Sequence, residues 1–151
     1  DVTPPPNMNA GLDLTYLPGL KLTANTNMVL ANYPPAARFP AVYQGKGSTA
    51  TGDGTIDLDL GQQYQVSQIN LGFFSSNNWA GGGSVQIAAT PGAWTTVDDS
   101  GRGHTFGPPA TGGVKTVSFA RQTVRFIRIT DYFSAGVGTS AGRLDEIEVY
   151  N

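Results

Sequence analysis

The clearest candidate for chemistry is the segment Phe73-Phe74-Ser75-Ser76-Asn77-Asn78-Trp79, in which a strand pattern ends in aromatic residues and a polar loop follows. Carbohydrate recognition needs a flat apolar surface for the C–H face of a sugar and planar amide or guanidinium groups for its hydroxyls. Loops on a rigid scaffold supply both. Phe73 continues the inward alternation of its strand and is assigned to the core. The other members are candidate sugar-binding residues: Phe74, Asn77, Asn78 and Trp79. The alternative is a loop tip packed against the domain.

The residues needed for catalysis are scarce. The chain has no cysteine and a single histidine, His104, in a glycine-flanked loop, which excludes a Cys–His dyad and disfavours a Ser–His–Asp triad. Glycoside hydrolysis needs two carboxylates roughly 5–10 Å apart, one of them with a raised pKa. Asp57 and Asp59 point outward from one strand, and Glu146 and Glu148 share a strand face. We therefore predict that the chain is not an enzyme.

Short alternating segments must position these residues. Thr55 to Leu60 alternates perfectly, Val66 to Phe74 continues the pattern after a turn at Gly61-Gln62-Gln63, and the stretch from Asn25 to Gly54 is expected to be a long ordered loop. Thr123 to Thr130 is the strongest strand signal and is expected to lie centrally. No segment has sustained helical periodicity, so the sequence predicts an all-β domain.

Three polar or aromatic residues near these strands are assigned structural roles. Trp94 opens a strand. Arg125 and Arg128 are predicted to lie on opposite faces of their strand, where each pairs with an acid or covers apolar surface. None of the three is a predicted ligand contact.

Composition limits the possible partners. The 151 residues suit one domain, with residues 1–10 as a proline-rich linker and 11–151 as the folded unit. Only 13% of residues are charged and the nine Lys and Arg are scattered, which argues against nucleic acid and makes anionic membranes poor partners. No apolar run approaches a membrane span of about 20 residues, and the first residues lack signal-peptide features.

Three segments in this order and spacing resemble the discoidin, or coagulation factor V/VIII type C, domain. They are Asp57 to Ile69, Val124 to Ile129 and Leu144 to Tyr150. Within that family the chain is most similar to bacterial family 32 carbohydrate-binding modules, over about residues 20–150. The resemblance implies a galactose-binding-like jelly-roll β-sandwich of about eight antiparallel strands, with a ligand site on loops at one end.

The resemblance also implies further candidates around that site. Tyr132 and Phe133 enter a loop that walls the site in the family, where each either stacks on sugar or anchors the loop inside the domain. Tyr33 and Arg38 belong to a first long loop at the same end, by analogy, and Arg38 is a candidate hydroxyl donor or a solvated surface residue.

A structural calcium ion is the one cofactor that the resemblance implies. The family's loop of the form Asp-Gly-Asn-x-x-Thr falls on Gln44 to Thr49, and the Glu of the final strand falls on Glu146. Gln44 replaces the first carboxylate, which weakens a site for a hard cation. The candidate metal ligands are Glu146, Gln44, Thr49, Asp145, Lys46 and Ala41.

The function expected from these observations is carbohydrate binding without catalysis. The chain is interpreted as a monomeric module of a larger secreted bacterial glycoside hydrolase or polysaccharide lyase, binding exposed sugar units of a glycan. An adhesion or assembly domain that recognises protein or lipid is the alternative, although the Gly, Asn and Ser rich loops lack the apolar and basic spikes that membrane binding needs.

Overall fold

A computed structural model gives the architecture of the chain. It describes residues 13–17, 19–25, 27–30, 43–45, 52–73, 79, 81–108, 113–132 and 143–151. The elements are a short 3-10 helix η1 (Leu14–Tyr16) and strands β1 (Lys21–Ala24), β2 (Met28–Leu30), β3 (Tyr43–Gly45), β4 (Gly54–Phe73), β5 (Gly83–Ala88), β6 (Thr95–Asp99), β7 (Val114–Asp131) and β8 (Arg143–Tyr150). All strand pairs are antiparallel.

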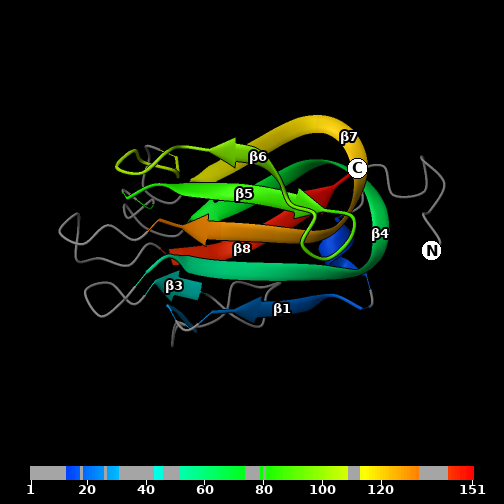
Figure 1. The fold of residues 1–151 in the computed structure, drawn as a ribbon, viewed down its shortest axis with the longest axis horizontal. Coiled ribbons are helices and arrows are strands. Elements are labelled where there is room, and N and C mark those ends of the chain that lie inside the picture. Colours follow the sequence, from blue (N-terminus) through cyan, green and yellow to red (C-terminus); the bar gives the residue numbers. More distant parts are fainter. Residues whose placement is uncertain are drawn as a thin grey trace.

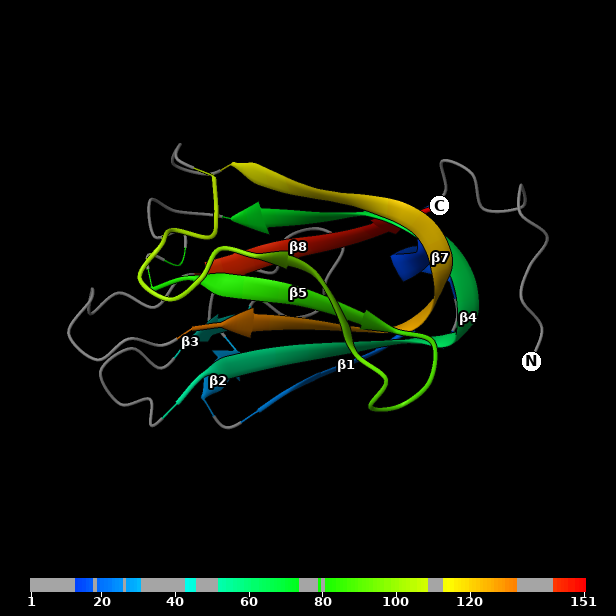
Figure 2. The same cartoon turned by 45° about the horizontal axis from the view of Figure 1, so that its top comes forward.

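Two long strands connect the two layers of the sandwich. β4 and β7 pair along nearly their whole length, and both bend in the middle, so that each contributes one half to each layer (Figure 1). The first layer, here called the front sheet, runs β1, first half of β4, second half of β7, β5, β6. The second layer runs β2, β3, β8, second half of β4, first half of β7. Figure 2 shows the two layers one above the other. The predicted all-β jelly-roll sandwich is confirmed.

The bend in β4 replaces the predicted turn between two strands. Gly61 has a φ of 87°, and a Cβ at this position would lie 3.0 Å from the carbonyl oxygen of Gly19. Only glycine tolerates both the positive φ and the close backbone approach. The ladder to β7 shifts register between Asp59 and Tyr64 and then resumes, so the chain turns the corner without leaving the sheet.

The space between the layers is filled by the inward face of each strand. The predicted alternation is confirmed in β4, where Ile56, Leu58 and Leu60 are buried before the bend, and Ile69 and Leu71 after it. Burying each such side chain contributes about 1.5–3 kcal/mol relative to leaving it exposed. β7 is central, between β4 and β5, as predicted.

Several strand ends lie together at one end of the sandwich, here called the loop end. Strands begin or finish there at Gly54, Phe73, Gly83, Asp131 and Arg143, while the bends of β4 and β7 and the C-terminus lie at the opposite end (Figure 1). The predicted long loop between Asn25 and Gly54 is interrupted by two short strands, β2 and β3, which extend the second layer beyond β8.

Candidate functional site

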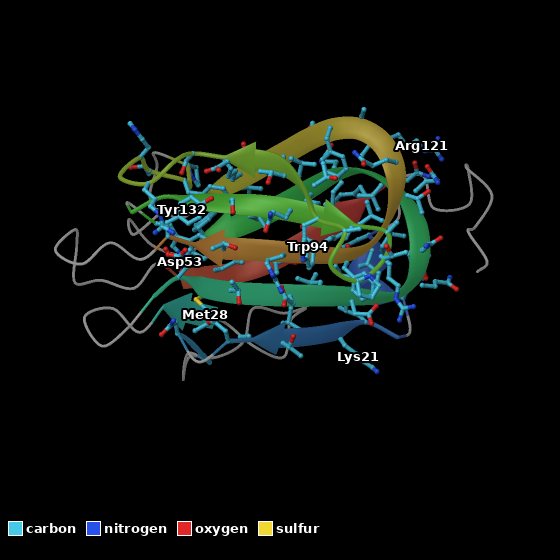
Figure 3. All side chains as sticks on the ribbon, viewed as in Figure 1. Lys21, Met28, Asp53, Trp94, Arg121 and Tyr132 are labelled. Atoms are coloured by element: carbon cyan, nitrogen blue, oxygen red, sulfur yellow. The ribbon has the colours of Figure 1, made fainter. Side chains whose placement is uncertain are left out.

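A polar and aromatic cluster lies at the loop end, here called the loop-end cluster: Asp53, Arg102, Asp131 and Tyr132. Arg102 Nη1 donates to Asp53 Oδ1 at 2.9 Å, and its Nη2 donates to the other carboxylate oxygen. The same guanidinium lies 4.7 Å from the centre of the Tyr132 ring. Asp53 and Tyr132 come together because Gly54 pairs with Asp131 in the β4–β7 ladder, and Figure 3 shows the two labelled residues at this end.

Side-chain amides hold Asp53 in place. Asn25 Nδ2 donates to the carbonyl oxygen of Asp53 at 2.9 Å, and Asn27 Nδ2 donates to the same oxygen at 3.2 Å. Asn25 Oδ1 in turn accepts from the backbone N–H of Thr55 at 3.1 Å. These bonds tie the start of β4 to the segment that joins β1 and β2, so the backbone at Asp53 has a defined position.

Backbone hydrogen bonds fix the turn that carries Arg102. The N–H of Gly103 donates to the carbonyl of Gly81 at 2.9 Å, and the N–H of Gly101 donates to Asp99 Oδ1 at 2.8 Å. Tyr132 N–H donates to the carbonyl of Gly82 at 2.9 Å. Three separate segments are therefore bonded to one another, and the guanidinium is presented on a fixed turn although it is 61% exposed.

Asp131 adds a second carboxyl group beside Asp53. Burial raises the pKa of the Asp131 carboxyl to about 7, and the nearby charge of Asp53 acts in the same direction. Near neutral pH the group is therefore partly protonated and can donate as well as accept a hydrogen bond. Together with Arg102, the loop-end cluster offers both donors and acceptors of the kind that sugar hydroxyls require.

Trp79 corrects a prediction, because it lies in the core and not at a ligand surface. Its side chain is 2% exposed, its ring stacks on Phe106 with centroids 5.6 Å apart, and it meets Phe73 edge-on at 5.5 Å. Trp79 has a φ of 53°, a conformation that a bulky residue seldom adopts. Aromatic packing therefore holds Trp79 itself in the core, and its ring offers no free face to a sugar.

Of the other predicted sugar contacts, only Tyr132 falls within the described residues, where it is half-buried. Those outside the described residues are Phe74, Asn77, Asn78, Phe133, Arg38 and Tyr33. Arg102, Asp53 and Asp131 were not predicted from the sequence. For Asp53 and Asp131 the one usable signal was position, because Asp53 precedes β4 and Asp131 ends the neighbouring strand β7.

The candidate calcium ligands are only partly described. Gln44 lies in β3 and pairs with Arg143 of β8 in the strand register. Glu146 lies farther along β8, opposite Gly72. Thr49, Lys46 and Ala41 fall outside the described residues, as does the side chain of Asp145. Within the described part of the chain, no three acidic, histidine or cysteine side chains form a metal-binding group.

Two of the carboxylates considered for catalysis, Asp57 and Asp59, are bonded to arginines. Arg128 Nε donates to Asp57 Oδ1 at 2.7 Å, and Arg125 Nε donates to Asp59 Oδ1 at 2.8 Å, so both acids are engaged in ion pairs as predicted for the two arginines. The arginines were expected on opposite faces of β7, which is wrong. The register shift at the bend brings both to carboxylates on the same outward face of β4.

His104 is exposed on its turn. A search of the described helices found none long and apolar enough to cross a membrane.

Comparisons with known proteins agree with this architecture. Residues 21–135 match the model of the F5/8 type C domain family. No curated protein matches the chain. Among solved structures, chitosan-binding module 1 from a chitosanase/glucanase of Paenibacillus sp. IK-5 is 20% identical, with a TM-score of 0.66 over 92% of this chain and 98% of that one.

Two structures with bound sugars have the same fold. The family 32 carbohydrate-binding module of Clostridium perfringens NanJ, in complex with galactose, is 21% identical, with a TM-score of 0.62 over 88% of this chain and 94% of that one. The family 32 module of AlyQ, in complex with 4,5-unsaturated mannuronic acid, is 20% identical, with a TM-score of 0.60 over 86% and 93%. At these identities the likeness concerns the fold.

Proposed function

Since the chain belongs to the F5/8 type C domain family, we propose that it is a non-catalytic carbohydrate-binding module whose ligand site is the loop end. The observation that supports this most is the Arg102 guanidinium, which is stacked on Tyr132 and held by Asp53 on a fixed turn. Structures of the same fold hold galactose and an unsaturated mannuronic acid, which supports sugar as the ligand class.

The loop-end cluster has the chemistry that binding a sugar requires. Arg102 has five N–H donors, of which Asp53 takes two, so the others remain for sugar hydroxyls. The Tyr132 ring supplies apolar area for the C–H face of a pyranose. Because the Arg102 side chain is already bonded to Asp53 and lies over the Tyr132 ring, little side-chain entropy is lost when a ligand binds.

The module acts within a larger protein in this proposal. One of the similar structures derives from a chitosanase/glucanase, which supports an extracellular bacterial glycan-active enzyme as the parent. Residues 1–10 would form the proline-rich linker to the catalytic domain. A monosaccharide buries little area, so binding at one site is weak, and the tether makes it useful by raising the local concentration of substrate. The module itself would be monomeric.

Calorimetry with a panel of hexoses, uronates and glucans tests this function. We expect binding of at least one sugar with a Kd of about 0.1–10 mM, typical of a small polar ligand. Tyr132→Ala and Arg102→Ala should each weaken it at least tenfold. Arg121→Ala, which removes an exposed cation at the bend, should leave it unchanged. The proposal fails if no sugar binds, or if the module binds phosphatidylserine liposomes instead.

A further inference from the structure

A groove on the outward face of the front sheet lies away from the loop-end cluster. Its volume is about 260 Å³, and it is lined by Lys21, Thr23, Asp57, Leu58, Asp59, Trp94 and Phe126. We call it the sheet-face groove. Figure 3 shows Trp94 over the middle of this sheet and Lys21 on β1, while Tyr132 and Asp53 lie at the loop end.

Strand register explains why these side chains share one face. Lys21 of β1 pairs with Asp59 of β4, which pairs with Phe126 of β7. Two residues along, Thr23 pairs with Asp57, which pairs with Arg128. Side chains two apart on a strand point the same way, so the two rows form one continuous polar and aromatic surface.

The Trp94 side chain forms a wall of the sheet-face groove. The loop between β5 and β6 turns back across the front sheet (Figure 2) and brings the ring to Arg128, whose guanidinium lies 4.6 Å from the ring centre. Arg128 is itself held by Asp57, so the indole rests on a fixed support. Trp94 remains only partly buried, and with Phe126 it supplies apolar surface beside polar groups.

The charges of the sheet-face groove favour an acidic ligand. Asp57 and Asp59 each accept two hydrogen bonds from one guanidinium, and the pKa of Asp59 is lowered chiefly by its bond from Arg125, so both carboxylates are paired with arginines. Lys21 adds a third cation. Counting the two arginines that pair with the carboxylates beside the groove, the described residues there carry three cations against two carboxylates, which is one net positive charge.

We propose that the sheet-face groove is a second carbohydrate-binding site, which takes a pyranose unit bearing a carboxylate, as in a uronate-containing glycan. The apolar face of the sugar packs against Trp94 and Phe126, and its carboxylate meets the Lys21 ammonium. The Thr23 hydroxyl and the free lone pairs of the paired carboxylates bind sugar hydroxyls. With the loop-end cluster, the module would then engage acidic polysaccharide at two places, and avidity would strengthen its hold on long chains.

Titration of the ¹⁵N-labelled protein with trigalacturonate tests the proposal. The chain has two tryptophans, so its spectrum holds two indole N–H signals, which Trp94→Phe assigns. Buried Trp79 serves as the internal reference. We expect trigalacturonate to shift the Trp94 signal with a Kd of about 1–10 mM. Neutral galactotriose should bind at least threefold more weakly.

Variants separate this site from the loop-end cluster. Trp94→Ala should weaken binding at the sheet-face groove at least tenfold, followed through the backbone amide signals of β1 and β4, and Lys21→Ala should weaken it about threefold for trigalacturonate only. Tyr132→Ala should leave the Trp94 shift intact, and Arg121→Ala is the matched control for Lys21→Ala. A Trp94 signal unmoved by about 20 mM trigalacturonate overturns the proposal. So does equal binding of the neutral trisaccharide with no effect of Lys21→Ala. Neither result bears on sugar binding at the loop end.

Discussion

The loop end and the front sheet both carry an arginine that pairs with an aspartate and lies over an aromatic ring. On the front sheet, Arg128 bonds Asp57 on the neighbouring strand, and the β4–β7 ladder sets their spacing. At the loop end, Arg102 bonds Asp53 from a turn that is held by hydrogen bonds to Gly81, Gly83 and Asp99. The same three residue types are therefore positioned by sheet register in one place and by loop packing in the other.

Exposure shows what each arrangement can be used for. The side chain of Arg128 is 34% exposed and its guanidinium lies between Trp94 and Asp57, so it contributes mainly to the fold. The side chain of Arg102 is 61% exposed. The ion pair on the sheet thus supports a neighbouring side chain, whereas the loop-end pair leaves a cation largely exposed.

The largest expected effect concerns the aromatic core beneath the loop end. Trp79→Ala should lower the free energy of unfolding by about 3–5 kcal/mol, because it empties a site packed by Phe73 and Phe106. Urea denaturation measures this. Trp79→Phe, which keeps an aromatic ring, should lose less and should bind sugar as the parent does. If a fully stable Trp79→Phe variant lost sugar binding, Trp79 would be a ligand contact and not only a core residue.

Asp131 gives the loop end a pH dependence. Its pKa is raised from 3.8 to about 7, so the folded state binds a proton more tightly than the unfolded state. This contribution to stability is fully present below about pH 4 and is lost as the pH rises to about 7. At pH 8 Asp131→Asn should therefore raise the free energy of unfolding, by about 2–4 kcal/mol if the neutral amide fits. Urea denaturation at pH 5 and pH 8 checks this. A variant with the same pH dependence as the parent contradicts the buried-carboxyl account.

The two arginines should separate stability from binding. Arg128→Ala should lower the free energy of unfolding by about 1 kcal/mol, since it removes a cation–π contact and a half-exposed ion pair. Arg102→Ala should change stability less and loop-end sugar binding more. Thermal melts and calorimetry on both variants measure the two effects. If Arg102→Ala lowered stability more, and Arg128→Ala weakened loop-end sugar binding more, the assignment of stability to the Arg128–Asp57 pair and of binding to the Arg102–Asp53 pair would be wrong.

The smallest expected effect concerns calcium. We propose that the Gln44 loop and Glu146 bind this ion weakly, because the first carboxylate of the family's loop is absent. Gln44→Asp should tighten calcium binding roughly tenfold, read as a larger rise in Tm between EDTA and excess calcium. Gln44→Glu tests whether charge alone suffices. An unchanged calcium response in both variants would argue against metal binding at this loop.

Sequence alone predicted the front sheet well and the loop end poorly, for a physical reason. Alternation in Thr55–Leu60 placed Ile56, Leu58 and Leu60 inward, because a strand has a fixed period of two residues. The same rule failed at the bend, where a register shift brings Arg125 and Arg128 to one face.

No comparable rule governs the loop end. Arg102 meets Asp53 across 49 residues, and the contact depends on how the turn after β6 bonds to Gly81. Trp79 looked like an exposed loop tip because its neighbours are polar, but its burial depends on Phe106, 27 residues later. Residue types indicated what the loop end contains, and only the fold shows which side chains meet.

The most direct test of carbohydrate binding at the loop end is a crystal structure of the module soaked with a small panel of hexoses and uronates. We expect a sugar ring within hydrogen-bonding distance of Arg102 and in contact with Tyr132. Sugar seen only elsewhere on the surface, with the loop-end cluster unchanged, or no bound sugar from any member of the panel, would contradict the account.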